Sequence, residues 1–363
     1  MRENFCESTS RPQFIDPKKF IHPQDQTSST SNIRGFQLPG IIDIHFHGAF
    51  GWDFAFGNAE KIEAMLDQVM QEGITGVFPT LITCSEEQRV NALKDIASVM
   101  RNRKAPPLLH GIYLEGPFLA AAKKGSHPEQ DLMAPDFALL EKWQEAAEGN
   151  IKIITIAPEL PGAIEFIEKA SETGVICALG HSNATWEQTQ AAIDAGANHV
   201  THLFNAMPSL HHRQPNLLSC VLANKNLSVE LIGDSVHLAP EMLKLCYSIY
   251  ESDQIIIISD CVATTGLPEG RHQLYGRELI TSANSCRLKD GNLFGGSSIL
   301  TRSLQKLGQA DKFAWGLLGT SVWRNPCRLM QIEPPDTEVF FDQDFKWLGT
   351  RCNSHWYWTN DQK

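Results

Sequence analysis

Two histidines separated by a single residue end a short apolar segment, just before a glycine, in the stretch "LPGIIDIHFHG". If this segment is a β-strand, residues two apart share a face, so the imidazoles of His45 and His47 point the same way. Two adjacent nitrogen donors can form half of a metal site. A pair of hydrogen-bonded structural histidines would have the same spacing, so the rest of the chain must decide between the two interpretations.

Other residues able to do chemistry follow further short apolar runs. Glu115 follows "IYL", His181 follows "ALG", His202 follows "HVT" and Asp260 follows "IIIIS". A glutamate and two histidines supply three ligands and leave one position open for water, as in catalytic zinc sites, and the histidine pair could add a second metal position with the glutamate as a bridge. A metal of this kind brings the pKa of its water close to neutrality. The aspartate is suited to take a proton from that water and return it to a leaving group, although it could also be a simple turn residue.

The elements that must position these residues can be read from the apolar pattern. From Leu38 onward, short β-rich runs alternate with stretches of helical periodicity, which is typical of a parallel sheet with crossover helices. The eight expected strands are Ile41–His45, Gly76–Ile82, Leu109–Leu114, Ile151–Ala157, Val175–Gly180, His199–Leu203, Ser228–Ile232 and Ile255–Ser259. The expected helices include Ala59–Glu72, Glu86–Met100, Pro161–Thr173, Thr185–Ala195 and Pro240–Ser248.

Eight such units predict a (β/α)8 barrel of the TIM type. In such barrels the active site lies at the carboxyl ends of the strands, where the residues named above are found. His237 also follows an expected strand, the seventh. The segment Leu267–Gly291 is the least regular part and is predicted to form turns and short strands instead of a helix.

Composition narrows the class of protein. The 363-residue chain is 42% hydrophobic and has a formal net charge of −11, which disfavours binding to nucleic acid or anionic membranes. No apolar run is long enough to span a bilayer, and no secretory signal is visible. The nine cysteines are scattered without a CxxC pair, so we expect reduced thiols and a cytoplasmic location.

An ordered series of motifs resembles the N-acetylglucosamine-6-phosphate deacetylase family of the amidohydrolase superfamily. The motifs are "PGIIDIHFHG", "YLEGPFLAAAKKGSH", "LGHSNAT", "AGANHVTHLFNAM", "HHRQP", "LIGDSVH", "ISDCVATTGLPEG" and "LFGGSS". They extend over roughly residues 38 to 330, and their order makes the resemblance specific. The strand-four end, "IAPE", has no lysine for a carbamylated metal bridge, which disfavours other amidohydrolases.

The resemblance implies roles for the residues that match the family's motifs. Glu115, His181 and His202 match the ligands of the main divalent metal, which would be zinc, and Asp260 matches the catalytic base and acid. The HxH pair, His45 and His47, matches ligands of a second metal that only part of the family has. The implied reaction is hydrolysis of the acetamide of N-acetylglucosamine 6-phosphate by a metal-activated water.

Substrate contacts are implied in the same way. His127 matches a residue that hydrogen-bonds the acetamide oxygen as that oxygen gains negative charge, a large term in acyl transfer. His237 and Arg213 match phosphate contacts, and a guanidinium suits a phosphate because it forms two parallel hydrogen bonds. In the family the arginine reaches into the neighbouring subunit's site, which implies a homodimer. The remaining matched positions are Ser126, Asn205, Ala206, Phe294, Gly295 and Gly296.

The chain ends depart from the family pattern. We expect residues 1–38 to form a loop or part of a small β appendage, 39–331 the metal-dependent barrel, and 332–363 the return to the appendage. The tail from Ile332 lacks the usual glycine-rich return and has "EVFFDQDFKWLG" instead, so the appendage should be reduced or divergent.

Two other functions fit the same residues. The enzyme could act on a related substrate, such as N-acetylgalactosamine 6-phosphate or another N-acyl sugar or amino acid, because the sequence does not specify a hydroxyl epimer. The protein could also be a catalytically silent sugar-phosphate sensor, although such proteins tend to lose a ligand or the base, and every one of these residues is present. Activity towards phosphorylated sugars and metal content would separate these hypotheses.

Overall fold

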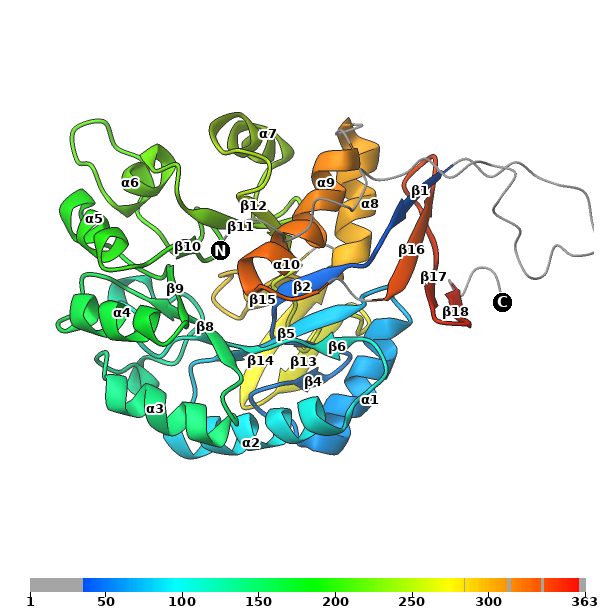
Figure 1. The fold of residues 1–363 in the computed structure, drawn as a ribbon, viewed down its shortest axis with the longest axis horizontal. Coiled ribbons are helices and arrows are strands. Elements are labelled where there is room, and N and C mark those ends of the chain that lie inside the picture. Colours follow the sequence, from blue (N-terminus) through cyan, green and yellow to red (C-terminus); the bar gives the residue numbers. More distant parts are fainter. Residues whose placement is uncertain (1–34, 284, 312–314, 334–335, 359–363) are drawn as a thin grey trace, which may run out of the picture.

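The structure is a computed structural model that describes residues 35–283, 285–311, 315–333 and 336–358. Most of the expected N-terminal segment therefore lies outside the described residues. Figure 1 shows a barrel ringed by helices, with a small antiparallel sheet at one side where the two ends of the described chain meet.

Eight parallel strands form the barrel, as the sequence predicts. In spatial order they are β2 (Ile42–Phe46), β5 (Gly76–Ile82), β7 (Ile112–Glu115), β8 (Ile151–Ile156), β9 (Ile176–Leu179), β10 (His199–Val200), β11 (Ser228–Ile232) and β12 (Ile255–Ile258). The barrel closes where β12 meets β2: the Asp260 amide donates to the His45 carbonyl at 3.0 Å, and the His47 amide donates to the Cys261 carbonyl at 2.8 Å. The barrel thus closes at His45, His47 and Asp260, three of the candidate site residues.

Two strands differ from their predicted ranges by three residues at one end, and the others match within one residue at each end. The expected strand at 199–203 stops at Val200, because His202 adopts a left-handed backbone with φ 25° that the β-ladder does not accommodate. The expected strand at 109–114 is divided into β6 (Leu108–Leu109) and β7. The His110 amide bonds to Val77 on β5, whereas the Ile112 amide bonds to the carbonyl of Asn150 before β8, so the ladder with β5 is interrupted between them and resumes in β7.

Amphipathic helices cover the outside of the barrel. In α1 (Ala59–Met70) the buried residues Ile62, Met65, Leu66 and Val69 recur at helical spacing, and the Asn58 side chain caps the N-terminus. The others are α2 (Glu86–Asn102), α3 (Phe137–Ala146), α4 (Ala163–Glu172), α5 (Trp186–Asp194), α6 (Leu217–Ala223), α7 (Pro240–Ile249), α8 (Leu300–Asp311), α9 (Trp315–Val322) and α10 (Arg324–Met330). Among the described residues, every helix is too short or too polar to cross a bilayer.

The two ends of the described chain meet in a four-stranded antiparallel sheet. Its strand order is β1 (Gly35–Leu38), β16 (Thr337–Asp342), β17 (Trp347–Cys352) and β18 (His355–Trp358). The rings of Phe36 and Phe345 stack at 5.1 Å between centroids. The segment after Ile332 therefore returns to pair with β1, although it lacks the glycine-rich motif.

A three-stranded sheet follows β12, where turns and short strands are predicted. It consists of β13 (Gly270–Leu274), β14 (Arg277–Ser282) and β15 (Ser285–Leu288). The Phe294 amide donates to Cys286 of β15 at 2.9 Å, and Arg277 donates to the Ser126 carbonyl at 2.8 Å. A short hairpin after β2, formed by β3 (Gly48–Ala49) and β4 (Trp52–Asp53), lies near it, since Tyr275 donates to Gly51 at 3.0 Å. This sheet holds the loop that carries Phe294 over the carboxyl ends of the barrel strands.

Candidate active site and metal centre

The chemically competent side chains are presented by unusual backbone at the strand ends. His181, His202 and Asp260 follow β9, β10 and β12 with φ values of 47°, 25° and 52°. Non-glycine residues in this region are held there by their surroundings, and they are enriched at functional sites. The sharp change of direction turns each side chain towards one point above the barrel.

Glu115, His181 and His202 form a compact group of donor atoms. Glu115 Oε1 lies 3.0 Å from His181 Nε2 and 2.8 Å from His202 Nε2, and the two nitrogens are 3.1 Å apart. Bonds of about 2.0–2.1 Å to a tetrahedral zinc would place ligand atoms about 3.3–3.4 Å apart. The spacing and the chemistry of these donors therefore fit a divalent metal.

The outer nitrogen of His181 supports this interpretation. His181 Nδ1 lies 2.8 Å from the Lys123 carbonyl, which can only accept a hydrogen bond, so Nδ1 carries the proton and Nε2 presents a lone pair. Burial would raise the pKa of Glu115, but its interactions with the imidazoles of His127 and His45, including the hydrogen bond from His127, hold it well below its usual range. The group thus offers a carboxylate and a nitrogen lone pair to a cation.

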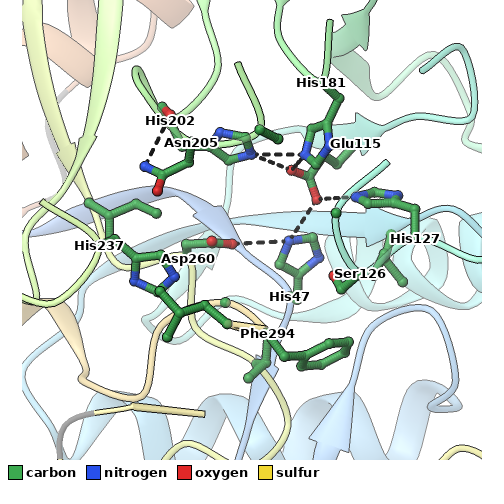
Figure 2. A pocket seen from close by; sticks show the side chains of 17 residues that line it. His47, Glu115, Ser126, His127, His181, His202, Asn205, His237, Asp260 and Phe294 are labelled. Atoms are coloured by element: carbon green, nitrogen blue, oxygen red, sulfur yellow. Dashed lines mark hydrogen bonds and ion pairs between the residues drawn. The ribbon is translucent and has the colours of Figure 1, made fainter. Parts of the chain in front are cut away.

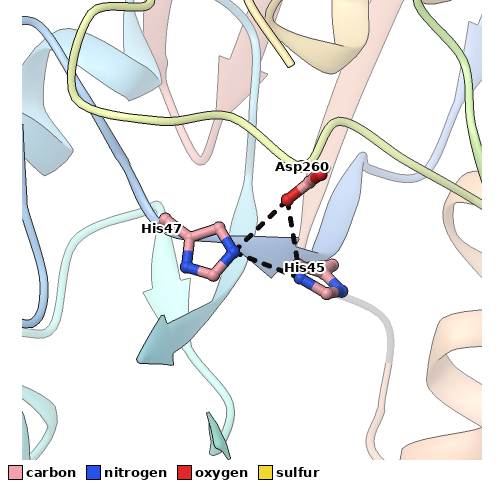
Figure 3. A group of neighbouring side chains, drawn as sticks. All are labelled: His45, His47 and Asp260. Carbon is pink, nitrogen blue, oxygen red and sulfur yellow. Dashed lines mark hydrogen bonds and ion pairs between the residues drawn. The ribbon is translucent and has the colours of Figure 1, made fainter. Parts of the chain in front are cut away.

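A second group of donors consists of His45, His47 and Asp260 (Figure 3). The Nε2 atoms of the two histidines are 3.3 Å apart, and Asp260 Oδ1 lies 3.5 Å from His45 Nε2 and 3.3 Å from His47 Nε2. Glu115 lies between the groups, with Oε2 3.2 Å from His47 Nε2. Burial alone would lower the pKa of His47, but hydrogen bonds to Asp260 and Glu115 outweigh it and raise the pKa to about 9. A positive charge, from protons or from a metal, is therefore favoured here.

His127 has a defined tautomer. The Thr83 backbone amide donates to His127 Nδ1 at 3.3 Å, and the Thr83 hydroxyl lies 2.8 Å from the same nitrogen. Burial lowers the pKa of His127 to about 4, so the ring is neutral and its proton is on Nε2. Nε2 lies 3.2 Å from Glu115 Oε2 and is placed to donate a hydrogen bond beside the metal ligands.

The two donor groups, except for the buried His45, and His127 border one pocket of about 640 Å³, with open solvent at its mouth included (Figure 2). Its lining of convergent polar side chains suits a small-molecule ligand. Seven of the residues predicted to contact substrate line it, namely Ser126, His127, Asn205, Ala206, His237, Phe294 and Gly295. His237 donates from Nδ1 to Asp234 at 2.7 Å; burial lowers the pKa of His237, but the Asp234 carboxylate raises it above its usual 6.5, which favours a cation facing the pocket.

Comparison with known proteins agrees with this geometry. A model of the amidohydrolase family matches residues 36–261, the segment from β1 to the residue after Asp260. The chain belongs to the amidohydrolase family. It is thus a metal-dependent hydrolase that acts on amide bonds.

Named relatives of this amidohydrolase share a narrower activity. The chain is 32% identical over 90% of its length to the N-acetylglucosamine-6-phosphate deacetylase of Bacillus subtilis, of which it covers 81%. It is 33% identical over 71% of its length to the N-acetylgalactosamine-6-phosphate deacetylase of Escherichia coli O157:H7, of which it covers 68%. The fold matches a Mycobacterium smegmatis N-acetyl-D-glucosamine-6-phosphate deacetylase mutant, solved in complex with N-acetyl-D-glucosamine-6-phosphate, with a TM-score of 0.83, 27% identity, and coverage of 90% of this chain and 87% of that one.

Three residues predicted for the site of this amidohydrolase lie outside the pocket lining. His45 is fully buried behind His47. Gly296 packs against the end of β12, where a Cβ would lie 2.1 Å from the Ser259 carbonyl, so it shapes the loop beneath Gly295. Arg213 is exposed, and its guanidinium contacts His212 at 2.6 Å. The structure of one chain therefore does not bring Arg213 to the pocket.

Sequence reasoning missed several supporting residues of this amidohydrolase. Glu230 lies within the apolar strand β11 and bonds to two histidines, Thr83 orients His127, and Arg277 holds the Ser126 loop. The glutamate inside "SVELI" could have indicated a buried polar contact, because a carboxylate within a barrel strand is rarely buried without a hydrogen-bonding partner. Thr83 and Arg277 gave no comparable signal.

Proposed function

We propose that the protein hydrolyses the acetamide of N-acetylglucosamine 6-phosphate, giving glucosamine 6-phosphate and acetate. The observation that carries the proposal is the convergence of Glu115, His181 and His202 with Asp260 beside a single pocket. Relatives named for this activity, at 32% and 33% identity, support the choice of substrate.

In this proposal Glu115, His181 and His202 hold one divalent metal, and zinc suits their nitrogen and carboxylate donors. His45, His47 and Asp260 form a second position, which is an addition to the first and not a requirement for the reaction. When bound, the metal lowers the pKa of a water molecule and polarises the amide carbonyl.

The acid–base work falls to Asp260. Burial would raise the pKa of Asp260, but the hydrogen bond from His47 and the charge of His45 lower it, so the carboxylate is ionised and able to accept a proton. We propose that it takes the proton of the attacking water and then delivers it to the nitrogen of the departing amine. His127 Nε2 donates a hydrogen bond to the amide oxygen as negative charge develops there.

The opposite side of the pocket would bind the sugar phosphate. His237 bears a proton favoured by Asp234 and faces the phosphate, while Ser126, Asn205 and the backbone of Ala206 contact the sugar. The loop at Phe294 and Gly295 covers it. The exposed position of Arg213 is compatible with a homodimer in which this arginine reaches the neighbouring subunit's phosphate. Buried thiols such as Cys177 and Cys261 form no disulfide, which supports a cytoplasmic setting.

The test is release of free amine from N-acetylglucosamine 6-phosphate by the purified chain, with added zinc or with a chelator. We expect turnover that the chelator removes and zinc restores. Unphosphorylated N-acetylglucosamine should be a much poorer substrate, because His237 then has no anion to bind. Absence of turnover in the zinc-loaded protein, with tight binding of the sugar phosphate, would instead identify a silent sensor.

N-acetylgalactosamine 6-phosphate is the second candidate substrate. It is favoured by the 33% identity to a relative named for that activity. The two sugars differ in one hydroxyl configuration, and the same assay decides between them through the ratio of their kcat/KM values.

A further inference from the structure

Glu230 is a buried carboxylate behind the donor groups of the metal centre. It lies on β11, its side chain has no exposed surface, and it does not line the pocket. It therefore cannot contact the substrate. A carboxylate without access to water is stable only where hydrogen-bond donors surround its oxygens.

Three donors surround it. His45 Nδ1 lies 2.9 Å from Oε2, His199 Nε2 lies 2.9 Å from Oε1, and the backbone amide of His202 donates to Oε2 at 3.1 Å. His199 is itself buried, with Nδ1 2.7 Å from the Ser228 hydroxyl. Glu230 thus links a histidine of the second donor group to the backbone of a ligand of the first.

The contact with Glu230 determines which nitrogen of His45 faces the metal position. A carboxylate accepts hydrogen bonds, so His45 Nδ1 keeps a proton, and Nε2 is the nitrogen directed at His47 and Asp260, where a bound cation would take the place of any proton on it (Figure 3). The ring of Tyr113 packs on His45 at 4.8 Å between centroids and restricts its rotation. A flipped ring would place a carbon against the carboxylate and lose the bond.

We propose that Glu230 is a positioning residue that fixes the tautomer and orientation of His45, and thereby enables His45, His47 and Asp260 to hold a second divalent cation. This inference rests on the metal assignment proposed above. Carboxylates that hold the outer nitrogen of a ligating histidine typically change metal affinity 10- to 100-fold when they are replaced.

The first donor group depends on Glu230 much less. His181 is oriented by the Lys123 carbonyl, and Glu115 is on another strand, so Glu230 contacts that group only through the amide of His202. The role is therefore selective: loss of the carboxylate should weaken the second position and spare the first.

The test measures zinc binding to the metal-free full chain by calorimetry, with metal content determined by mass spectrometry. We expect two zinc ions in the wild type. In Glu230→Gln the second dissociation constant should rise about 10- to 100-fold while the first stays close to wild type. Because Glu230 acts through His45, the second substitution should add no further loss in a His45→Asn, Glu230→Gln double variant.

Thr75→Val is the matched control. Thr75 is fully buried in the same barrel, and its hydroxyl bonds to the backbone of Ile41, away from both donor groups. This variant should lose buried hydrogen bonds yet keep both zinc affinities. If Glu230→Gln does not fold, Glu230→Asp withdraws the carboxylate by one methylene from His45, and the same selective loss is expected.

The outcomes are distinct. An unchanged second affinity in a folded Glu230 variant, or equal weakening of both positions, overturns the inference and leaves the proposed function intact. A wild type that binds a single zinc at the first position overturns the second metal position and the role of Glu230 with it. A wild type that binds no zinc overturns the proposed metal-dependent function itself.

Discussion

The pocket has a floor and a rim that are built differently. The floor comprises Glu115, His181, His202 and Asp260, and the rim comprises Asn205, His237 and Phe294. Floor residues end or directly follow barrel strands, are at most 7% exposed and lie within hydrogen-bond distance of other titratable groups. Rim residues lie on loops and are held by neighbours outside the barrel strands, as His237 is by Asp234 and Phe294 by Cys286 of β15.

This difference separates chemistry from recognition. Strand ends in a closed barrel are fixed relative to one another, which suits atoms that must meet a metal within tenths of an ångström. Loops can change without altering the barrel, which suits contacts that select the substrate. Substitutions on the floor should therefore affect kcat, and substitutions on the rim should affect KM.

The sharpest test of the floor is Asp260→Asn. Loss of the proton acceptor should lower kcat on the order of 10²- to 10⁴-fold with little change in KM. Steady-state amine release measures it, with metal content assayed in parallel. Asp136→Asn is the control, since Asp136 caps α3 at the surface and asparagine caps equally well. Retention of wild-type kcat in Asp260→Asn would remove Asp260 from the mechanism.

A rim substitution, His237→Asn, should have a smaller and different effect. A hydrogen bond to a charged group contributes about 1.5–3 kcal/mol, so KM for the phosphorylated sugar should rise about 10- to 100-fold while kcat is nearly kept. KM for the unphosphorylated sugar should not change. A fall in kcat for both sugars would contradict the division between floor and rim.

The pH dependence of KM tests the same residue without a substitution. The pKa of His237 is raised above 6.5, so the cation is present below that raised pKa and is lost as pH rises through it. KM for the sugar phosphate should therefore increase on the alkaline side, by less than His237→Asn causes, because neutral imidazole can still donate one hydrogen bond. The His237→Asn variant should lack this increase of KM at alkaline pH. If the increase persists in the variant, it arises from the titration of another group.

Away from both regions, His110 should affect stability alone. Burial lowers its pKa from 6.5 to about 4, so the unfolded chain gains a proton below pH 6.5 that the folded protein does not. The protonation of His110 in the unfolded chain should lower the free energy of unfolding of the wild type by about 1 kcal/mol at pH 5.5 and not at pH 8, and His110→Gln should lack this loss. Chemical unfolding at the two pH values measures it against His355→Gln, a change at an exposed histidine. Equal pH responses of wild type and variant would mean that His110 titrates normally.

The sequence by itself determined the barrel and the membership of its floor. Apolar runs of strand length alternating with helical periodicity have few compact solutions, and a closed parallel barrel brings every strand end to one edge. Residues such as Glu115 and His181 could thus be grouped from their place after a strand, without knowledge of any side-chain contact. The structure matches these positions, and it places Asp260 beside His47 as the order of strands requires.

The tertiary structure decided what depends on contacts between distant residues. Glu230 bonds to His45 across 185 positions of the chain, and no local pattern states that pairing. The end of β10 at Val200 follows from a left-handed His202 that the surrounding loops impose, and Gly296 supports the Phe294 loop because only a residue without a Cβ fits against Ser259. Periodicity specifies which face a residue occupies, whereas the partner it meets there is fixed only when the barrel closes.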